Sequence, residues 1–504
     1  MLLPLGGVLA AALGGGSAGI GASELARYGL TTALLAVMVG LTTAIVGTLA
    51  AWLVVTCRFP GRGVFEWALA LPLAMPAFAI AYGYADLLDV AGGLRTWLRT
   101  QTGMDLPFEI RTTGGAAFIL SAAFYPYVYL AMRSAFLSQS GSLLEAARML
   151  GCTGWAAFLR VGLPMARPAL AAGVALAVME TLADYGAVQF LSVQTLTTGV
   201  VRAWSVYGSV PGAARLALPL LACAALLLVI ERASRKGRGH EQARSRWRGL
   251  ERMKLGSLAG FGAASFCTSL VAAGLLIPAG WLLWNLNPGA ADWARLGQAV
   301  RNSAGLALAG AGLTVGLATV LALGARRLPL AVRLASLGYA TPGAVMAIGL
   351  LAPAGIIWTM APGAGLPIAL ALLLLAYAAR LMAAALEPID AGLQRVPPAL
   401  VQAARMLGRG DTRASLEVEI PLARSALLTA GLIVLVDILK ELPATLILRP
   451  FNFDTLAVIA SNYASDERLE QAGLPSLMIL LVCLPAVIWL TRQVAAISPS
   501  SKER

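Results

Sequence analysis

The sequence predicts an all-α polytopic membrane protein with about twelve transmembrane helices, arranged as two parallel repeats of six helices. The first observation is composition. Of the 504 residues, 59% are hydrophobic and 12% are charged, which is too little polar surface for a water-soluble fold. The second is a series of apolar stretches long enough to cross a bilayer as helices, which satisfy their own backbone hydrogen bonds in lipid. The third is a polar motif that occurs once in each half of the chain.

The predicted spans follow from these apolar stretches and from the short polar breaks between them. They lie near residues 2–21, 31–55, 68–88, 114–132, 169–189, 214–231, 255–284, 305–325, 337–358, 367–386, 426–447 and 474–491. The first span contains the run Gly14 to Gly16 and has no basic flank. Because it lacks the basic n-region and the cleavage site of a signal peptide, we interpret it as a helix.

Basic residues predict the orientation, because Lys and Arg concentrate in cytoplasmic loops. In the twelve-span arrangement the basic segments fall on one side of the membrane: 58–62, 133–167, 232–254, 326–333 and 380–424. Both termini are therefore expected in the cytoplasm, and the protein in a bacterial inner membrane. The net charge of +13 is spread over this face with few aromatic residues, so it indicates topology and anionic lipid headgroups rather than nucleic-acid binding.

Matching features recur in the two halves. Pro76 and Gly83 in the third predicted span correspond to Pro342 and Gly349 in the ninth, and we expect both prolines to kink their helices. Six predicted spans separate the two copies of the polar motif, so both halves cross the membrane in the same direction. The sequence therefore predicts a first repeat over residues 1–231, a basic cytoplasmic linker over 232–254 and a second repeat over 255–504.

Residues for metal, redox or phosphate chemistry are sparse. The five cysteines show no C-x-x-C spacing, and the single histidine, His240, lies among the charges of the linker. None of the four lysines follows a glycine, so the sequence lacks the P-loop that binds ATP. We expect no cofactor, no metal site and no enzyme activity in this chain.

The repeated motif predicts a helix, a turn and a second short helix outside the membrane. It reads Glu145-Ala-Ala-Arg-Met-Leu-Gly151 with Val161-Gly-Leu-Pro164, and then Gln402-Ala-Ala-Arg-Met-Leu-Gly408 with Val418-Glu-Ile-Pro421. The alanines allow another backbone to approach closely, the glycine suits a left-handed helix stop, and the proline lets the chain turn before the next span. Two copies favour docking on a partner over the alternative, an ordinary loop that packs on its own bundle.

This spacing of Glu-Ala-Ala, Gly and Leu-Pro resembles the coupling motif in the membrane subunits of binding-protein-dependent ABC importers of the type I fold. In that family the short helix of this loop sits in a groove of the ATP-binding subunit. The first copy fits the motif fully, whereas the second departs from it at Gln402 and Ile420. The resemblance implies that coupling to the ATPase involves Glu145, Ala146, Ala147, Gly151, Pro164, Gln402, Ala403, Ala404, Gly408 and Pro421.

Other segments resemble the fused permeases of ferric-iron importers: 180–186, 194–199, 440–445, 449–456 and 464–468. The similarity covers nearly the whole chain and implies import of ferric iron, although permeases for thiamine, phosphonate, sulfate or polyamines share the same scaffold. It also implies two ATP-binding cassette subunits on the cytoplasmic side, identical or different, and an external substrate-binding protein.

Ionisable groups recur inside two predicted spans. Glu180 and Asp437 lie at equivalent depths, and Asp184 and Glu441 follow four residues later on the same helix face. Carboxylates at mid-bilayer depth normally face a cavity or a partner, so these residues, together with Lys440 as a counter-ion of Asp437 or Glu441, are candidates for the translocation pathway. The alternative is that the spans are shorter and the carboxylates form hydrogen bonds at the outer headgroup level.

A second class of function also fits two six-helix halves: a secondary transporter that is driven by an ion gradient and needs no partner. The two docking loops favour the importer, and co-purification with an ATPase would discriminate the two classes. We interpret Asp105, Glu109 and Arg111 as residues of a solvated outer loop.

Overall fold

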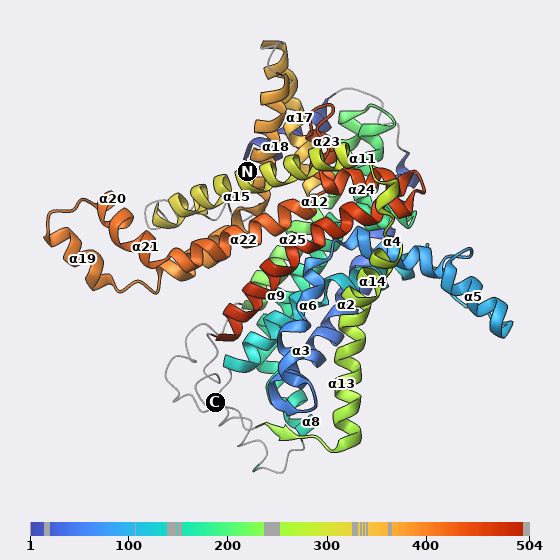
Figure 1. Ribbon diagram of the computed structural model, residues 1–504. Coiled ribbons are helices and arrows are strands. Elements are labelled where there is room, and N and C mark those ends of the chain that lie inside the picture. The colour runs from blue at the N-terminus through green and yellow to red at the C-terminus, as the bar shows by residue number, and fades with distance from the viewer. Residues whose placement is uncertain are drawn as a thin grey trace. The chain divides into compact units, whose positions relative to one another are not determined.

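The computed structural model describes residues 2–14, 21–105, 107–138, 149, 154–235, 252–324, 331–332, 335, 338, 341–360 and 365–496. Figure 1 shows that these residues are almost entirely helical. Within them the only strands are two short ones, β1 (Cys57–Arg58) and β2 (Met253–Lys254), which pair in parallel. The all-α fold predicted from composition is confirmed.

The helices of the predicted first half are α1 (Leu2–Leu13), α2 (Ala22–Thr56), α3 (Arg62–Ala68), α4 (Ala77–Leu88), α5 (Gly93–Thr102), α6 (Thr113–Ser138), α8 (Gly154–Ala157), α9 (Leu163–Ala183), α10 (Gly186–Phe190), α11 (Leu196–Ser205) and α12 (Val210–Arg235). A 3₁₀ turn, η1 (Leu71–Ala74), precedes α4, and a π-helical turn, η2 (Phe158–Gly162), joins α8 to α9.

The helices of the predicted second half are α13 (Ser257–Val271), α14 (Ile277–Trp284), α15 (Trp293–Gly324), α17 (Gly343–Met360), α18 (Gly365–Leu393), α19 (Pro398–Met406), α20 (Asp411–Ala414), α21 (Ile420–Leu422), α22 (Arg424–Lys440), α23 (Pro443–Leu448), α24 (Leu456–Ser465) and α25 (Leu469–Ala496). The π-helical turns η3 (Ala272–Leu276) and η6 (Ser415–Glu419) lie before α14 and α21, and a 3₁₀ turn, η4 (Pro288–Ala290), lies before α15.

Eight of the described helices are long and apolar enough to cross a membrane, or up to ten if each of two bent pairs forms one span. The bent pairs fall on the third and eleventh predicted spans, with bends of 91° and 74°. The first and ninth predicted spans hold the shorter apolar helices Leu2–Leu13 and Gly343–Gly355. At 1.5 Å per residue, a helix of 12 residues covers about 18 Å, less than a bilayer core. Within the described residues, eight to ten of the roughly twelve predicted spans are therefore long and apolar enough to cross a membrane.

The chain forms two compact units, and each contains helices from both predicted halves. Unit 1 consists of residues 1–25, 196–221 and 289–462, and unit 2 consists of residues 26–195, 222–288 and 463–504. Unit 1 thus combines α15 to α24 with α1, α11 and the first part of α12. Unit 2 combines α2 to α10 with α13, α14 and α25.

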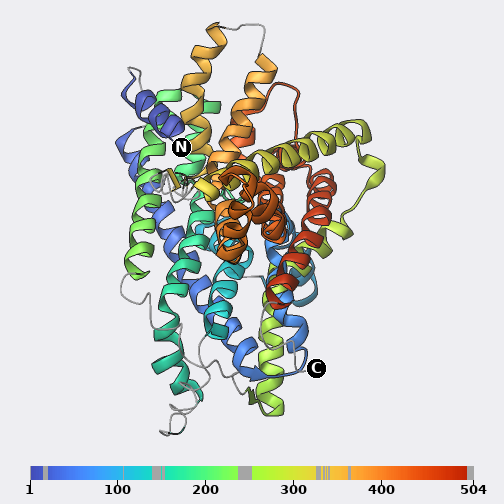
Figure 2. The ribbon, with the colours of Figure 1, turned by 90° about the vertical axis from the view of Figure 1, so that its left-hand side faces the viewer.

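In unit 1, α1 packs on α17 through two glycines, and Figure 2 shows these helices side by side. A Cβ atom on Gly7 would overlap the carbonyl of Gly349, and a Cβ atom on Gly349 would overlap the carbonyl of Pro4. Only glycine permits this backbone approach, which is how small residues bring membrane helices together. The position of α1 in unit 1 therefore depends on these two glycines.

In unit 2, glycines place α2 and α9 against α6. A Cβ atom on Gly47 of α2 would lie 2.7 Å from the Cβ atom of Val128, and one on Gly173 of α9 would lie 2.8 Å from the Cα atom of the same residue. Further along, Trp52 packs edge-on against Phe136 and at a tilt against Phe158, with ring centroids 5.4 and 4.7 Å apart. Small residues thus allow the close approach of the helices, and aromatic residues pack beside them.

The corresponding residues Gly83 and Gly349 have corresponding neighbours. Gly349 of α17 meets α1, and Gly83 of α4 meets Pro278 and Trp281 of α14 at 3.4 to 3.5 Å. Gly349 belongs to the second half and makes room for α1, the first helix of the first half. Gly83 belongs to the first half and makes room for α14, near the start of the second half.

Pro76 and Pro342 lie at the starts of α4 and α17, where a missing N–H leaves no hydrogen bond unmade. The expected kink is present at Pro76, as a bend of 91° between Arg62–Ala74 and Ala77–Thr102. A kink at Pro342 stays a prediction.

We predict that Gly349→Val destabilises unit 1, because the added side chain must force α1 away from α17. Overpacking of this kind costs about 1–3 kcal/mol or more. The measurement is the thermal unfolding temperature of the purified protein in detergent. Gly355→Val, in the same helix but with no atom within 4 Å of the new Cβ, is the matched control. Equal unfolding temperatures of the two variants would contradict the packing assigned to Gly349.

Candidate functional site

The second copy of the repeated motif forms the helix–turn–helix that its spacing predicts. α19 begins after Pro397, α20 and η6 run back from Asp411, and the chain bends by 74° between residues 411–422 and α22. Figure 1 shows α19, α20 and α21 set beyond the first residues of α22. This loop of residues 394–423 is referred to below as the second coupling loop.

Gly408 ends α19 in the left-handed conformation, with φ +79°. Its N–H donates to the carbonyl of Arg405 at 3.0 Å, and the N–H of Arg409 donates to the carbonyl of Ala404 at 3.1 Å. These two bonds form a Schellman motif, which satisfies the last carbonyls of the helix and favours glycine. The left-handed glycine stop predicted for the repeated motif is therefore present at Gly408.

The outer face of α19 is apolar and exposed. The side chains of Met406 and Leu407 are 89% and 82% exposed, and Gln402 and Ala403 are also exposed. Ala404, two residues before the end of α19, is buried, and α19 packs on η6. Its predicted contact with a partner stays a prediction.

Ion pairs brace the two arms of the second coupling loop. Arg405 Nε lies 3.2 Å from Asp411 Oδ1, and Arg409 Nε lies 3.1 Å from Glu417 Oε2. All four side chains are about half exposed, so each pair contributes about 0–1 kcal/mol. These pairs fix the angle between the arms more than they stabilise the protein.

Most of the first copy lies outside the described residues, including Glu145, Ala146, Ala147 and Gly151. Met149 is described, and its side chain is 90% exposed. It occupies the position of Met406 in the second copy. Sequence reasoning passed over this methionine, although its identity in both copies was a signal.

Pro164 and Pro421 lie in the same local structure. Each follows a five-residue π-helical turn, in which the N–H of Leu163 donates to the carbonyl of Phe158, and that of Ile420 to the carbonyl of Ser415. The wider turn relieves the clash that proline makes with the carbonyl four residues earlier. Pro164 was expected to turn the chain, but residues 155–183 form one continuous span, so the proline is accommodated inside a helix.

Asp184 and Glu441 occupy equivalent positions just after α9 and α22 end. Asp184 Oδ1 accepts hydrogen bonds from the N–H groups of Ala187 and Val188, at 3.1 and 3.2 Å. The Glu441 carboxylate accepts from the N–H groups of Ala444 and Thr445, at 2.8 and 2.9 Å. Each carboxylate therefore caps the following short helix, α10 or α23.

This geometry corrects the expectation that Asp184 and Glu441 continue a helix face. The helices end at Ala183 and Lys440, so the spacing of four residues no longer places the carboxylates above Glu180 and Asp437. Lys440 Nζ lies 3.4 Å from Asp437 Oδ1, so of its two predicted partners it pairs with Asp437. A role of these residues in the translocation pathway stays a prediction.

Glu441 has further partners that sequence reasoning missed. Its carboxylate lies 3.5 Å from Arg380 Nη1 and accepts a hydrogen bond from the Thr445 hydroxyl, which also pairs with Tyr377 Oη at 2.6 Å. Gly343 leaves room for the pair, since a Cβ atom there would lie 2.6 Å from Glu441 Oε1. The available signal was an arginine inside an apolar span.

The Arg380–Glu441 pair also affects the predicted orientation. We had counted Arg380 with the cytoplasmic basic residues, but its side chain is 14% exposed and meets Glu441 inside unit 1. A buried arginine that pairs with a carboxylate on another helix carries no information about which side its loop occupies. The orientation therefore depends on the remaining basic loops.

A helical bundle of this kind, with a docking loop outside the spans, is the architecture of an importer permease. The family model of the binding-protein-dependent transport system inner membrane component matches residues 44–235. Together with the relatives described next, this match shows that the chain belongs to that family, as the permease subunit of a binding-protein-dependent importer.

Three relatives illustrate the range of the family. The Fe(3+)-transport system permease protein FbpB 2 of Haemophilus influenzae is 26% identical over 89% of this chain and 86% of its own length. The sulfate transport system permease protein CysT of Escherichia coli is 30% identical over 39% of this chain and 72% of its own. The molybdenum transport system permease protein ModB of Escherichia coli is 31% identical over 36% of this chain and 82% of its own. Likeness over nearly the full chain indicates a fused permease of two repeats.

We predict that Glu441→Gln lowers the free energy of unfolding by about 3–5 kcal/mol, because it removes the carboxylate that faces the buried Arg380 guanidinium. Asp437→Asn, which breaks the more exposed pair on the same helix, is the matched control and should cost about 0–1 kcal/mol. Chemical unfolding of the detergent-solubilised protein measures both. Adding Arg380→Met to Glu441→Gln should restore part of the loss. A double variant that is no more stable than Glu441→Gln would argue against the pair.

Proposed function

We propose that this chain is the permease of an ATP-driven importer that moves ferric iron across a bacterial inner membrane. The observation that carries the proposal is the likeness to a ferric-transport permease over 89% of this chain and 86% of the relative. The segments that resemble ferric permeases lie in both halves, so the similarity is not confined to the coupling loops. A binding protein selects the cargo, and the permease opens alternately to its two sides.

Coupling to ATP hydrolysis is proposed to occur at the two loops. The exposed methionine at the same position in both copies supports this, because large exposed apolar side chains outside the lipid indicate a partner surface. Gln402, Ala403, Gly408 and Pro421 are exposed beside Met406, whereas Ala404 is buried. Two loops imply two ATP-binding subunits, one for each predicted repeat.

The proposed topology places both termini and both coupling loops in the cytoplasm. The halves are residues 1–231 and 255–504, with the linker 232–254 between them. Glu180 and the Asp437–Lys440 pair are the groups proposed for the pathway, because they are only partly buried on helices that otherwise carry apolar residues. Asp184 and Glu441 are proposed to act there through the short helices that they cap.

An oxyanion importer is the second candidate. Two relatives that transport sulfate and molybdenum are 30% and 31% identical to this chain. These identities are higher than the 26% of the ferric permease, although they extend over less than half of this chain.

The proposed ferric importer makes no use of a metal site in the permease. In the described part of the chain, no group of three or more His, Cys, Asp and Glu side chains is arranged to hold a metal ion.

The substrate is tested by uptake into proteoliposomes that contain the permease with the ATPase and binding protein encoded beside it. We expect ATP-dependent uptake of radioactive ferric iron, and no uptake of labelled sulfate or molybdate. A sulfate or molybdate signal without an iron signal would replace the ferric proposal with the oxyanion one. Uptake that proceeds without ATP in the presence of an ion gradient would instead indicate a secondary transporter.

The coupling role is tested by Met406→Glu, which places a charge on the exposed face of α19. If that face is buried against the ATPase, a loss of about 1.4–3 kcal/mol of binding lowers co-purification and transport about tenfold or more. Val206→Glu is the control, because Val206 is 67% exposed but lies outside both copies of the repeated motif and outside the predicted spans. Wild-type levels of both co-purification and uptake in Met406→Glu would remove α19 from the coupling surface.

A further inference from the structure

One helix has no counterpart in the other half. α5 lies between α4 and α6, which end and begin at Leu88 and Thr113. The equivalent helices of the second half, α17 and α18, are separated only by residues 361–364. A segment this short leaves no room for a helix like α5, so whatever α5 does is specific to the first half and to unit 2.

The connection holds α5 close to the end of α4. Only residues 89–92 join the two helices, and a Cβ atom on Gly92 would lie 2.7 Å from the carbonyl oxygen of Leu87, so the chain turns tightly against α4. Arg111 returns to the same place, with its Nε 2.7 Å from Asp89 Oδ2 and its guanidinium 5.1 Å from the ring centre of Phe190. Both ends of the segment are thus tied to the level at which the spans end.

The direction of α5 is across the bundle of unit 2 and not along it. The segment Ala77–Thr102, which contains α4 and α5, is bent by 91° from Arg62–Ala74. Figure 1 shows α5 extending sideways, away from α2, α6 and α13. α4 and α5 therefore turn away from Arg62–Ala74 together, and α5 points across the bundle of unit 2.

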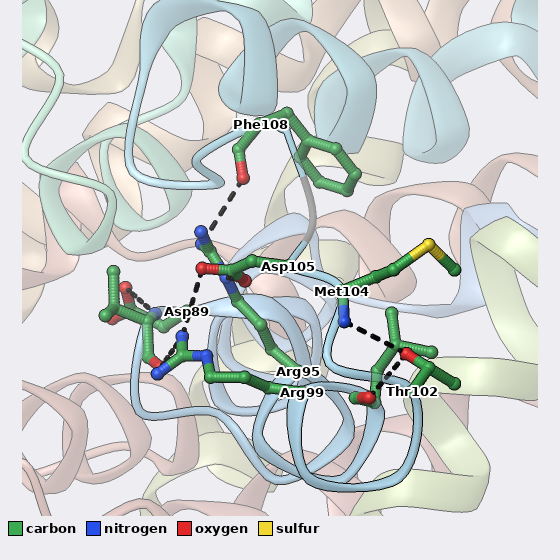
Figure 3. Close-up of polar contacts among 9 residues, drawn as sticks. Asp89, Arg95, Arg99, Thr102, Met104, Asp105 and Phe108 are labelled. Atoms are coloured by element: carbon green, nitrogen blue, oxygen red, sulfur yellow. Dashed lines mark hydrogen bonds and ion pairs between the residues drawn. The ribbon is translucent and has the colours of Figure 1, made fainter.

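The polar side of α5 is closed by its own loop, as Figure 3 shows. Arg95 Nε and Arg99 Nη2 donate to the two carboxylate oxygens of Asp105, at 2.6 and 3.2 Å. Arg95 also donates to the carbonyl of Phe108, and Arg99 to that of Val90, both at 3.3 Å. The two basic groups are therefore occupied within the segment, and their charge is partly neutralised.

The opposite side of α5 is apolar and open. Leu94 and Trp97 are three residues apart and so share a helix face, and their side chains are 46% and 57% exposed. Three large apolar side chains from the flanking turns are exposed as well: Val90, Met104 and Phe108. Side chains of this type and number are unfavourable in water.

We propose that α5 is an interfacial helix whose apolar face lies in the headgroup region of the bilayer, in the leaflet next to the end of α4. Three observations favour lipid over a protein partner. The segment lies between α4 and α6, α5 extends across the bundle of unit 2, and its exposed face carries the tryptophan that membrane interfaces favour. Because Asp105 engages both arginines, attachment does not depend on anionic lipid.

The test uses the full-length protein in phosphatidylcholine vesicles and compares tryptophan fluorescence of the wild type with that of Trp97→Phe. The difference between them is the emission of Trp97. We expect this emission to lose most of its intensity to lipid brominated near the headgroup end of its acyl chains, and little to acrylamide in the water. Adding phosphatidylglycerol should leave the quenching unchanged.

Trp52→Phe provides the control, because Trp52 is 4% exposed and packs on Phe136 and Phe158. Its emission should be quenched little by either reagent. If acrylamide quenches Trp97 and brominated lipid does not, the face is open to water and is a surface for a protein partner. If bromines at the far end of the acyl chains quench Trp97 best, α5 enters the hydrocarbon. Either result overturns the proposal.

Discussion

The constraint on which this structure depends is the cost of an unmade backbone hydrogen bond where water is scarce. In lipid each unsatisfied N–H or C=O costs several kcal/mol, so every interruption of a helix needs a substitute partner. The described residues supply one at four of these interruptions. Asp184 and Glu441 accept the first N–H groups of α10 and α23, and π-helical turns accommodate Pro164 and Pro421. The positions at which these helices are interrupted are therefore as clearly defined as the spans are.

The same substitute hydrogen-bond partners occur at the helix breaks of both predicted repeats, and they bear on how motion could pass between helices. In each half, the span after a coupling motif ends at a carboxylate that fastens it to the next short helix. In the proposed coupling mechanism, the span that follows each loop leads to a joint held by hydrogen bonds instead of a flexible loop. The second half strengthens its joint with Arg380, which makes the two halves chemically unequal.

Several features of the site were predictable because they depend on neighbouring residues. The helix before Gly408, the left-handed glycine and the pairing of Lys440 with Asp437 all involve groups within a few positions of one another. The Arg380–Glu441 pair was not predictable, because its members lie far apart in sequence on different helices. The burial of Ala404 was missed for a related reason: helical periodicity shows which residues share a face but not which face meets η6.

The sequence alone determined the membrane environment, the helical class, the approximate positions of most spans and the helix–turn–helix of the second motif copy, since composition and short-range spacing encode these. It also carried the resemblance to the permease family, which the comparisons confirm. Tertiary structure decided where the spans break, and it placed α1 on α17 and α14 on α4, each in a unit formed mostly by the other half. The reason is physical, because these arrangements follow from close packing of glycines against segments that are distant in the sequence. A local sequence pattern does not show which segment a glycine will pack against.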